Sequence, residues 1–353
     1  MMQNIWKNER LFNVLVPVIS AVLGMLAGAI IMVLGNYDPV VGFEALFNGM
    51  FGSPKAIGET IRAASPLILS GLAVGFAFKT GLFNIGVEGQ LLVGWLASVW
   101  VGYAFDLPGV LHVIVSILAA AIAGGFWGMI PGYLKAKFKV HEVIVTIMLN
   151  YVALYVTADL IKRYLYAGNE KSYRIKETAS LSSSFLSEIT EGSRLHWGIA
   201  VAIIAAIIMW FILEKTAMGY ELKSVGYNQH ASMYAGMNVS KNVVLSMTIS
   251  GAFAGIAGAM EGLGTFQNMT VLSSFTGTGF DGIAVALLGA NNAFGIILSS
   301  LLFGGLNTAA PQMNFDANVP SELIKIIISL IIFFVASGYI IRVIAERFSK
   351  EGK

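Results

Sequence analysis

Long apolar runs recur along the whole of this 353-residue chain, and they constrain its fold more than any other feature. A helix needs about 20 predominantly apolar residues to cross the hydrocarbon core of a bilayer. The runs predict ten candidate spans, at residues 11–35, 63–79, 88–105, 109–131, 141–161, 197–213, 243–263, 279–290, 293–310 and 321–341. The eighth is too short to cross alone, so we expect it to be re-entrant or half of a broken helix.

Composition agrees with a membrane protein, because only 12% of the residues are charged, against about a quarter in soluble proteins. We expect an all-α, polytopic membrane helix bundle of about ten transmembrane segments, forming a single transmembrane domain over residues 1–353. A net charge of +2 gives no sign of nucleic-acid binding. The chain has no cysteine and four scattered histidines, so we expect no metal site. No catalytic pattern stands out, and no catalytic residue is assigned.

Much of the abundant glycine lies inside the apolar spans at four-residue spacing, a pattern that clears one face of a helix. The pattern occurs at Gly24/Gly28, Gly71/Gly75, Gly124/Gly128/Gly132, Gly251/Gly255 and Gly258/Gly262. We expect these helices to pack closely against neighbours in the membrane.

Basic residues in the connecting segments predict the orientation of the chain. With the N-terminus inside, most lysines and arginines of short loops fall on the cytoplasmic side, so both termini are expected to be cytoplasmic. Residues 36–62 and 162–196 would then be external loops, and residues 214–242 a cytoplasmic loop. The serine-rich stretch 180–187 could hold a short amphipathic helix, although a solvated connector is the simpler expectation.

A polar, glycine-containing patch interrupts the apolar sequence at residues 83–90, which read Phe-Asn-Ile-Gly-Val-Glu-Gly-Gln. A carboxylate near the hydrocarbon edge is costly unless it faces protein, water or a partner. Glu88 therefore indicates either a transport pathway with a broken helix, or a tight helix start whose acid binds neighbouring backbone N–H groups. The sequence leaves both interpretations open.

The cytoplasmic loop 214–242 contains signals for a short helix. Asn228 is a suitable N-cap, residues 229–235 would form about two turns, and Gly236 fits the position after the helix. Such a helix could dock on a soluble motor or rest on the bilayer. No phosphate-binding loop is present, because Phe78 replaces the required glycine in the nearest match at residues 75–80. Any ATP would therefore be bound by another polypeptide.

Four stretches, residues 84–90, 141–150, 219–236 and 279–289, resemble bacterial ABC-importer permeases. The resemblance covers nearly the whole chain, and the order of the motifs makes it specific. The closest subgroup is the nucleoside permeases that work with binding lipoproteins of the basic-membrane-protein type. The wider family includes sugar and branched-chain amino-acid permeases. The resemblance implies the ABC-importer permease fold, a multi-pass location in the bacterial cytoplasmic membrane, and import of nucleosides.

The resemblance also implies partners. These are a second related permease forming a heterodimer, a cytoplasmic ATPase subunit with two ATP-binding domains that binds ATP and Mg²⁺, and an external substrate-binding lipoprotein. Membrane lipids surround the chain, and no cofactor is expected in the chain itself. The segment that contacts the ATPase would contain Gly219, Lys223, Gly226, Asn228, Ala231, Ala235 and Gly236.

Polar residues within or beside the spans are candidates for the substrate pathway, because nucleosides are neutral and rich in hydrogen-bonding groups. They are Asn84, Glu88, Gln90, Glu142, Asn150, Glu261, Asn268 and Asp281. For Glu142 a salt bridge with the nearby lysines 135, 137 and 139 is the better expectation, and for Asp281 a helix cap is the alternative. Competing functions are a ribose-type ABC permease, an ion-coupled secondary transporter with a buried acid, and, third, a channel.

Overall fold

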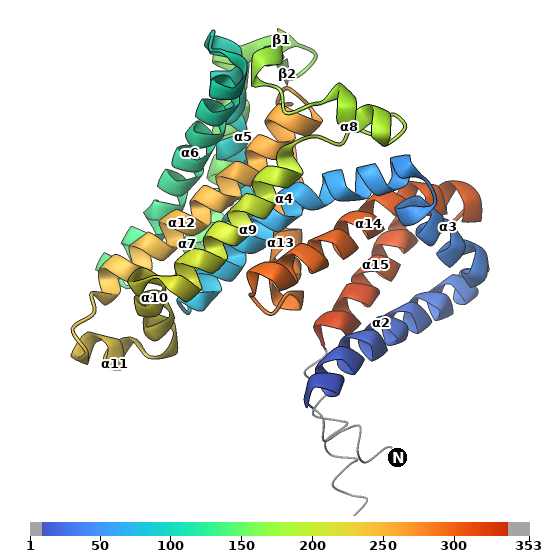
Figure 1. Cartoon of the computed structure of the whole chain (residues 1–353), viewed down its shortest axis with the longest axis horizontal. Coiled ribbons are helices and arrows are strands. Elements are labelled where there is room, and N and C mark those ends of the chain that lie inside the picture. The colour runs from blue at the N-terminus through green and yellow to red at the C-terminus, as the bar shows by residue number, and fades with distance from the viewer. Residues whose placement is uncertain (1–8, 338–353) are drawn as a thin grey trace, which may run out of the picture. The chain divides into compact units, whose positions relative to one another are not determined.

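The computed structural model describes residues 9–337, which are mostly helical (Figure 1). Contacts divide the chain into two compact units, residues 57–305 and residues 1–56 with 306–353. The end of the predicted span 321–341 lies outside the described residues. The elements are α2 (Glu9–Leu34), α3 (Pro39–Phe51), α4 (Pro54–Lys79), α5 (Val87–Ala104), α6 (Gly109–Phe138), α7 (Glu142–Leu160), η1 (Ile161–Leu165), β1 (Tyr166–Gly168), β2 (Lys171–Ser172), η2 (Glu177–Ala179), α8 (Ser184–Ile189), α9 (Gly198–Lys215), α10 (Ala217–Tyr227), α11 (Gln229–Tyr234), α12 (Val239–Ala259), η3 (Met260–Thr265), α13 (Thr278–Leu288), α14 (Ala293–Ala317) and α15 (Ser321–Ala336).

Six helices of the described part are long and apolar enough to cross a membrane. They are Pro54–Lys79, Gly109–Phe138, Glu142–Leu165, Gly198–Lys215, Val239–Thr265 and Ala293–Ala317. Each coincides with a predicted span, so the chain is a polytopic helical membrane protein. The predicted total of about ten spans is not confirmed, although the other four predictions also fall on helices, namely α2, α5, α13 and α15.

The segment expected as the external loop 36–62 is largely helical. Asp38 caps α3 by accepting a hydrogen bond from the Val40 N–H at 2.8 Å, and α4 begins at Pro54 rather than at residue 63. Charged residues ended the apolar run in the sequence, but an ion pair between Arg62 Nε and Glu59 Oε2, 2.6 Å apart, lets the helix continue through them.

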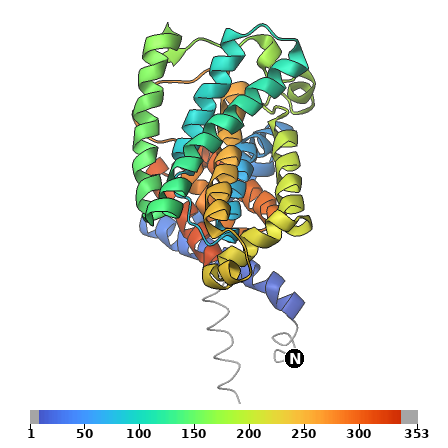
Figure 2. The same ribbon diagram turned by 90° about the vertical axis from the view of Figure 1, so that its left-hand side faces the viewer.

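The core of the unit formed by residues 57–305 is a close contact of α5, α6 and α12, and Figures 1 and 2 both show α6 and α12 side by side. A Cβ atom at Gly124 would lie 2.4 Å from the Gly251 carbonyl oxygen, and one at Gly94 would lie 2.3 Å from the Gly255 Cα. Only glycine permits such an approach, so the predicted close packing is confirmed for these helices.

The segment 162–196 is hydrogen-bonded to the rest of its unit and is not a free connector. Its backbone N–H groups donate to the stretch that follows α12: Ser172 to the Met269 carbonyl at 2.8 Å, and Leu181 to the Leu263 carbonyl at 2.9 Å. Helix α8 begins in the serine-rich stretch 180–187, so the alternative of a short helix there is correct and the simpler expectation of a solvated connector is wrong. Within this unit, β1, β2 and α8 lie at the end opposite to α10 and α11 (Figure 1).

In the other unit, α2, α3, α15 and the last turns of α14 pack through small residues. A Cβ atom at Gly28 would lie 2.8 Å from Ile327 Cγ2, and one at Gly49 would lie 2.8 Å from the Ala309 Cα. Gly28 thus serves close packing, as the sequence predicted.

Candidate functional site

The carboxylate of Glu88, in the first turn of α5, is completely buried and accepts four hydrogen bonds. Its Oε1 atom accepts from the Thr276 N–H at 2.8 Å, the Thr276 hydroxyl at 2.7 Å and the Gly277 N–H at 3.0 Å. Its Oε2 atom accepts from the Gly279 N–H at 2.7 Å. These donors precede or begin α13, so Glu88 satisfies N–H groups that have no partner within that helix.

The sequence left two interpretations of Glu88, and its bonding in the structure is that of an acid held by backbone N–H groups. The donors, however, come from residues 188 to 191 positions further along the chain rather than from neighbouring residues. The approach is tight, because a Cβ atom at Gly279 would lie 2.4 Å from the Glu88 nitrogen. Thr276 was missed by the sequence analysis, since nothing local connects it to Glu88.

Around Glu88, three predicted pathway amides are buried and hydrogen-bonded. Asn84 Nδ2 donates to Gln90 Oε1 at 2.9 Å and to Ser250 Oγ at 2.8 Å. Asn150 Oδ1 accepts from the Gly89 N–H at 2.8 Å. We call Asn84, Glu88, Gln90, Asn150, Ser250 and Thr276 the Glu88 junction. The junction connects α5, α7, α12 and the start of α13.

The remaining predicted pathway residues lie apart from one another. Asp281 is half-buried in the first turn of α13, close in sequence to the donors that Glu88 binds. The Asn268 carbonyl accepts from Trp95 Nε1 at 2.9 Å, and Glu261 lies in η3. Glu142 Oε2 is 2.5 Å from Lys135 Nζ, which confirms the expected salt bridge.

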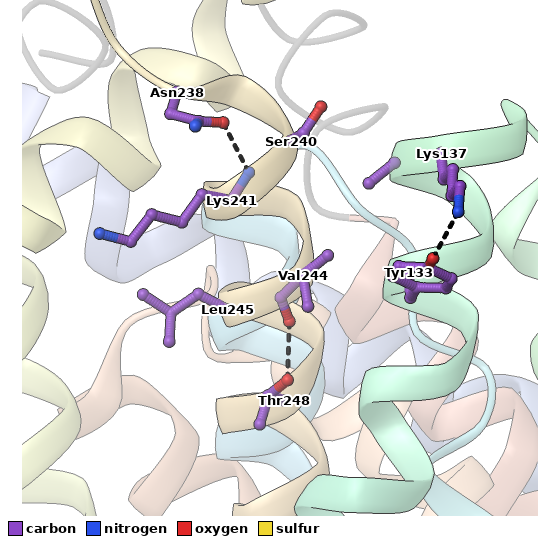
Figure 3. Close-up of a pocket in the computed structure, with 9 residues that line it drawn as sticks. Tyr133, Lys137, Asn238, Ser240, Lys241, Val244, Leu245 and Thr248 are labelled. Atoms are coloured by element: carbon purple, nitrogen blue, oxygen red, sulfur yellow. Dashed lines mark hydrogen bonds between the residues drawn. The ribbon is translucent and has the colours of Figure 1, made fainter.

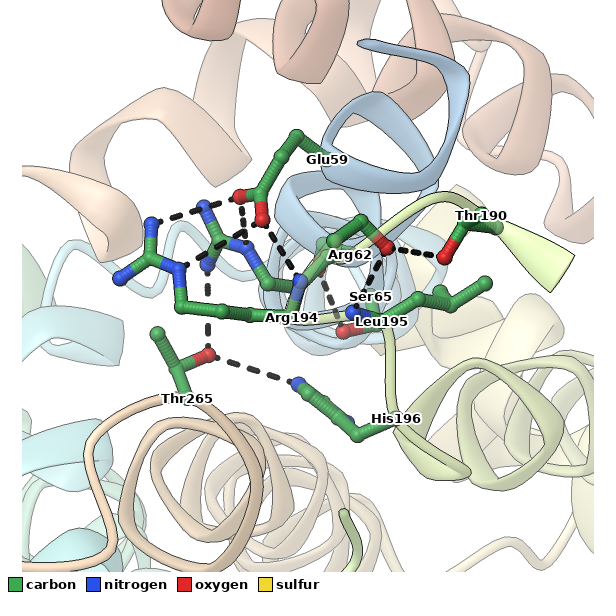
Figure 4. Close-up of polar contacts among 9 residues, drawn as sticks. Glu59, Arg62, Ser65, Thr190, Arg194, Leu195, His196 and Thr265 are labelled. Carbon is green, nitrogen blue, oxygen red and sulfur yellow. Dashed lines mark hydrogen bonds and ion pairs between the residues drawn. The ribbon is translucent and has the colours of Figure 1, made fainter. Parts of the chain in front are cut away.

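A second polar cluster, not found from the sequence, contains Glu59, Arg62, Arg194, His196 and Thr265 (Figure 4). Glu59 Oε2 pairs with Arg62 Nε at 2.6 Å and with Arg194 Nη2 at 3.3 Å. Arg62 Nη1 donates to Thr265 Oγ1 at 3.3 Å. This Arg62 cluster ties the first turns of α4 to η3 and to the segment before α9.

His196 completes the Arg62 cluster on its buried side. Burial, assisted by the positive charge of Arg62, lowers the pKa of His196 to about 4, so the ring is neutral at physiological pH. Nδ1 accepts from the Gly198 N–H at 3.1 Å, which leaves the proton on Nε2, 3.4 Å from Thr265 Oγ1. The cluster therefore closes the end of the bundle with groups that are already paired.

A polar cavity of ≈ 350 Å³ opens beside the Arg62 cluster. Its wall is rich in hydroxyl groups, and it is lined by Ser182, Ser183, Ser184, Ser187, Ser193, Arg194, Leu195, Gly264, Thr265 and Gln267. Such a surface offers many hydrogen-bonding groups to a neutral polar ligand.

At the opposite end of the unit, α10 and α11 form the helical part of the predicted cytoplasmic loop. Asn228 Oδ1 accepts from the Ala231 N–H at 3.0 Å, α11 spans Gln229–Tyr234, and Gly236 has φ +85°. The predicted cap, helix and following glycine are confirmed to within one residue. The preceding helix α10, capped by Thr216, was not predicted as a separate element.

The seven residues assigned to ATPase contact divide by exposure. Gly219 and Gly226 face their own chain, because added Cβ atoms would lie 2.1 Å from the Ile212 carbonyl oxygen and 2.3 Å from that of Lys79. Lys223 pairs with Glu214 at 3.0 Å. Ala231, Ala235 and Gly236 are exposed, and Asn228 serves as the cap.

Large side chains on α10 and α11 are exposed, among them three that the sequence analysis did not assign to a contact. Tyr227 is 91% exposed, Tyr234 is 89% exposed and Met233 is 57% exposed. Aromatic residues and methionine are enriched at protein interfaces. Their presence in an otherwise polar loop is the signal that could have revealed them.

Residues 56–336 match the family described as branched-chain amino acid transport system / permease component, and the chain belongs to that family. It is a transport component rather than an enzyme. It is 58% identical over 344 residues to the guanosine ABC transporter permease protein NupP of Bacillus subtilis, with coverage of 98% of this chain and 99% of the relative.

Two further relatives have similar descriptions. The nucleoside ABC transporter permease protein NupB of Lactococcus lactis subsp. cremoris is 42% identical over 347 residues, 96% of this chain and 95% of the relative. A second Bacillus subtilis protein, the guanosine ABC transporter permease protein NupQ, is 29% identical over 261 residues, 70% of this chain and 79% of the relative. One organism thus has two different permeases with the same described substrate, both related to this chain.

Proposed function

We propose that this chain is the permease subunit of an ATP-driven importer that carries nucleosides across the bacterial cytoplasmic membrane. The observation that carries the proposal is the similarity over 98% of the chain to a guanosine permease, supported by similarity over 96% to a nucleoside permease. The polar cavity beside the Arg62 cluster agrees with a neutral, hydroxyl-rich substrate.

The partners follow from the same relatives. NupP and NupQ occur in one organism, so we propose that this chain pairs with a second, related permease. A cytoplasmic ATPase subunit with two ATP-binding domains would hold ATP and Mg²⁺, and an external lipoprotein would deliver the nucleoside. Both termini and α11 would face the cytoplasm, and segment 162–196 would face outward.

The structure suggests how ATPase movement would reach the membrane core. Helix α10 touches the turn after α4, where an added Cβ at Gly226 would lie 3.1 Å from the Gly81 nitrogen. Three residues beyond this turn the chain enters the Glu88 junction at Asn84, and Glu88 binds the start of α13. We propose that a displacement of α10 and α11 repositions α13 through these contacts, opening and closing the pathway near Asp281.

The test is uptake by proteoliposomes that contain the complete complex. Radiolabelled guanosine, adenosine and uridine should enter only with ATP, and uptake should stop when the lipoprotein, the ATPase or the second permease is left out. Ribose, free bases and leucine should compete poorly. Transport of ribose with nucleosides inert would assign the chain to sugar transport, and ATP-independent uptake that collapses with an uncoupler would indicate an ion-coupled transporter.

A further inference from the structure

An open groove of ≈ 610 Å³ lies between the C-terminal end of α6 and the N-terminal end of α12 (Figure 3). Tyr133 and Lys137 line it from α6, and Lys241, Val244, Leu245 and Thr248 line it from α12. Both helices are long and apolar enough to span a membrane. The groove therefore runs from a helix end, at the depth of lipid headgroups, into the apolar part of two spans.

The side chains that line the groove change from charged to apolar along its length. On α12 the positions 241, 244, 245 and 248 form one stripe at helical spacing, and on α6 the positions 133 and 137 form another. Because α6 ends where α12 begins, Lys137 and Lys241 share the outer end, and Thr248 lies roughly 10 Å deeper. Charge is thus confined to the mouth, and aliphatic side chains follow behind it.

The two lysines at the mouth are exposed, and within residues 9–337 no ion pair joins either of them to an acid. Among the described residues, the ion pairs of this region join Lys135 and His141 to Glu142, and none includes Lys137 or Lys241. Lys137 Nζ donates to the Tyr133 hydroxyl at 2.9 Å and lies 5.4 Å from the centre of its ring. Tyr133 therefore holds one ammonium group at the groove.

We propose that this groove binds an anionic phospholipid, with its headgroup at the mouth, where Lys137 and Lys241 lie on opposite sides, and an acyl chain along Val244 and Leu245. Two cations at the mouth and an apolar wall behind them match the two chemically different halves of such a lipid. Basic residues at the membrane surface attract anionic headgroups at about 1 kcal/mol each. A zwitterionic lipid would fill the apolar part without the benefit of the two charges.

The proposal is tested on the complete transporter, exchanged into nanodiscs of phosphatidylcholine with phosphatidylglycerol as the minor component. The complex is then released from the nanodiscs, and the lipids that remain bound to it are counted by native mass spectrometry. The wild-type complex should retain phosphatidylglycerol in preference to phosphatidylcholine, and Lys137→Gln with Lys241→Gln should reduce that preference roughly thirtyfold. The matched control, Lys162→Gln with Lys171→Gln, removes two exposed lysines at the other end and should retain the lipid.

Two results of the lipid-retention measurement would overturn the proposal. One is equal retention of both lipids by the wild type; the other is undiminished phosphatidylglycerol on the Lys137→Gln, Lys241→Gln variant. A photo-crosslinking residue at Leu245 gives an independent measurement. It should capture lipid in the assembled complex, and capture of the second permease instead would show that the groove is a subunit interface. Melting of both double variants in phosphatidylcholine alone should match the wild type, which confirms that they are folded.

Discussion

Glu88 is a buried carboxylate stabilised by four neutral donors, three backbone N–H groups and one hydroxyl. Removing a carboxylate from water costs several kcal/mol, and hydrogen bonds to a charged group each return about 1.5–3 kcal/mol. The positive ends of the α5 and α13 dipoles add to the balance, because Glu88 lies in the first turn of α5 and beside the start of α13. These four hydrogen bonds therefore fix the carboxyl group of Glu88 against the start of α13.

We expect Glu88→Gln to lower the stability of the protein by about 2–3 kcal/mol. A glutamine oxygen could still accept from Thr276, but its NH₂ group would then face the Gly279 N–H, placing two donors together where Oε2 now accepts at 2.7 Å. The measurement is the melting temperature of the purified complex in detergent, taken together with ATP-dependent uptake.

The matched control is Glu188→Gln, which makes the same change at an exposed position of α8 and should leave melting unchanged. If Glu88→Gln melts like the wild type but transports differently, Glu88 acts in the pathway rather than in holding α13. An unchanged melting temperature with unchanged transport would remove both roles.

Helices α10 and α11 combine two roles that sequence reasoning treated as one. Gly219 and Gly226 fit α10 against its own chain, whereas Tyr227, Met233 and Tyr234 project into solvent. A glycine in a close backbone contact and an exposed tyrosine respond to substitution in different ways. The glycine contacts hold α10 in place, and the exposed tyrosines are free to contact a partner.

We expect Tyr234→Asp to weaken association with the ATPase subunit about tenfold while leaving the permease folded. The side chain is 89% exposed, so its own stability contribution is small, whereas aromatic side chains dominate the binding energy of many interfaces. The measurement is co-purification of the ATPase with the permease at increasing salt, alongside ATP-dependent uptake.

The contrasting variant is Gly226→Val. Its Cβ would lie 2.3 Å from the Lys79 carbonyl oxygen, so it should lower the melting temperature of the permease itself. Full ATPase retention by Tyr234→Asp with normal uptake would show that α11 rests elsewhere, for instance on the bilayer surface.

Across the unit formed by residues 57–305, segment 162–196 and helices α10 and α11 occupy opposite ends (Figure 1). The distribution of basic residues predicts that the first faces outward and the second faces the cytoplasm. Because the chain has no cysteine, single cysteines can report on both ends. Ser184 and Ala235 are exposed and suit this purpose.

A cysteine at Ser184 should react with an impermeant maleimide in intact cells, and a cysteine at Ala235 should react only after the membrane is opened. Western blotting of the mass-shifted protein measures both. Labelling of Ala235→Cys from outside would reverse the orientation and remove the basis for ATPase contact at α11.

The sequence by itself determined the helical class, the positions of six spans and, to within one residue, the limits of α11. Apolar runs and a capping asparagine followed by a glycine act over a few residues, so they can be recognised without knowing the fold. The same holds for the Lys135–Glu142 salt bridge, whose partners are seven residues apart. Hydropathy also placed the start of α4 too late, because a charged turn stabilised by an ion pair looks like a loop.

Only the tertiary structure decided what the polar residues of the core contact. Glu88 meets donors 188 to 191 positions away, Arg62 meets Thr265 across 203 positions, and Glu59 meets Arg194 across 135. A buried charge requires partners, but the sequence does not say which distant segment supplies them. That choice follows from how closely α5, α6 and α12 approach through their glycines, which is a property of the packed bundle.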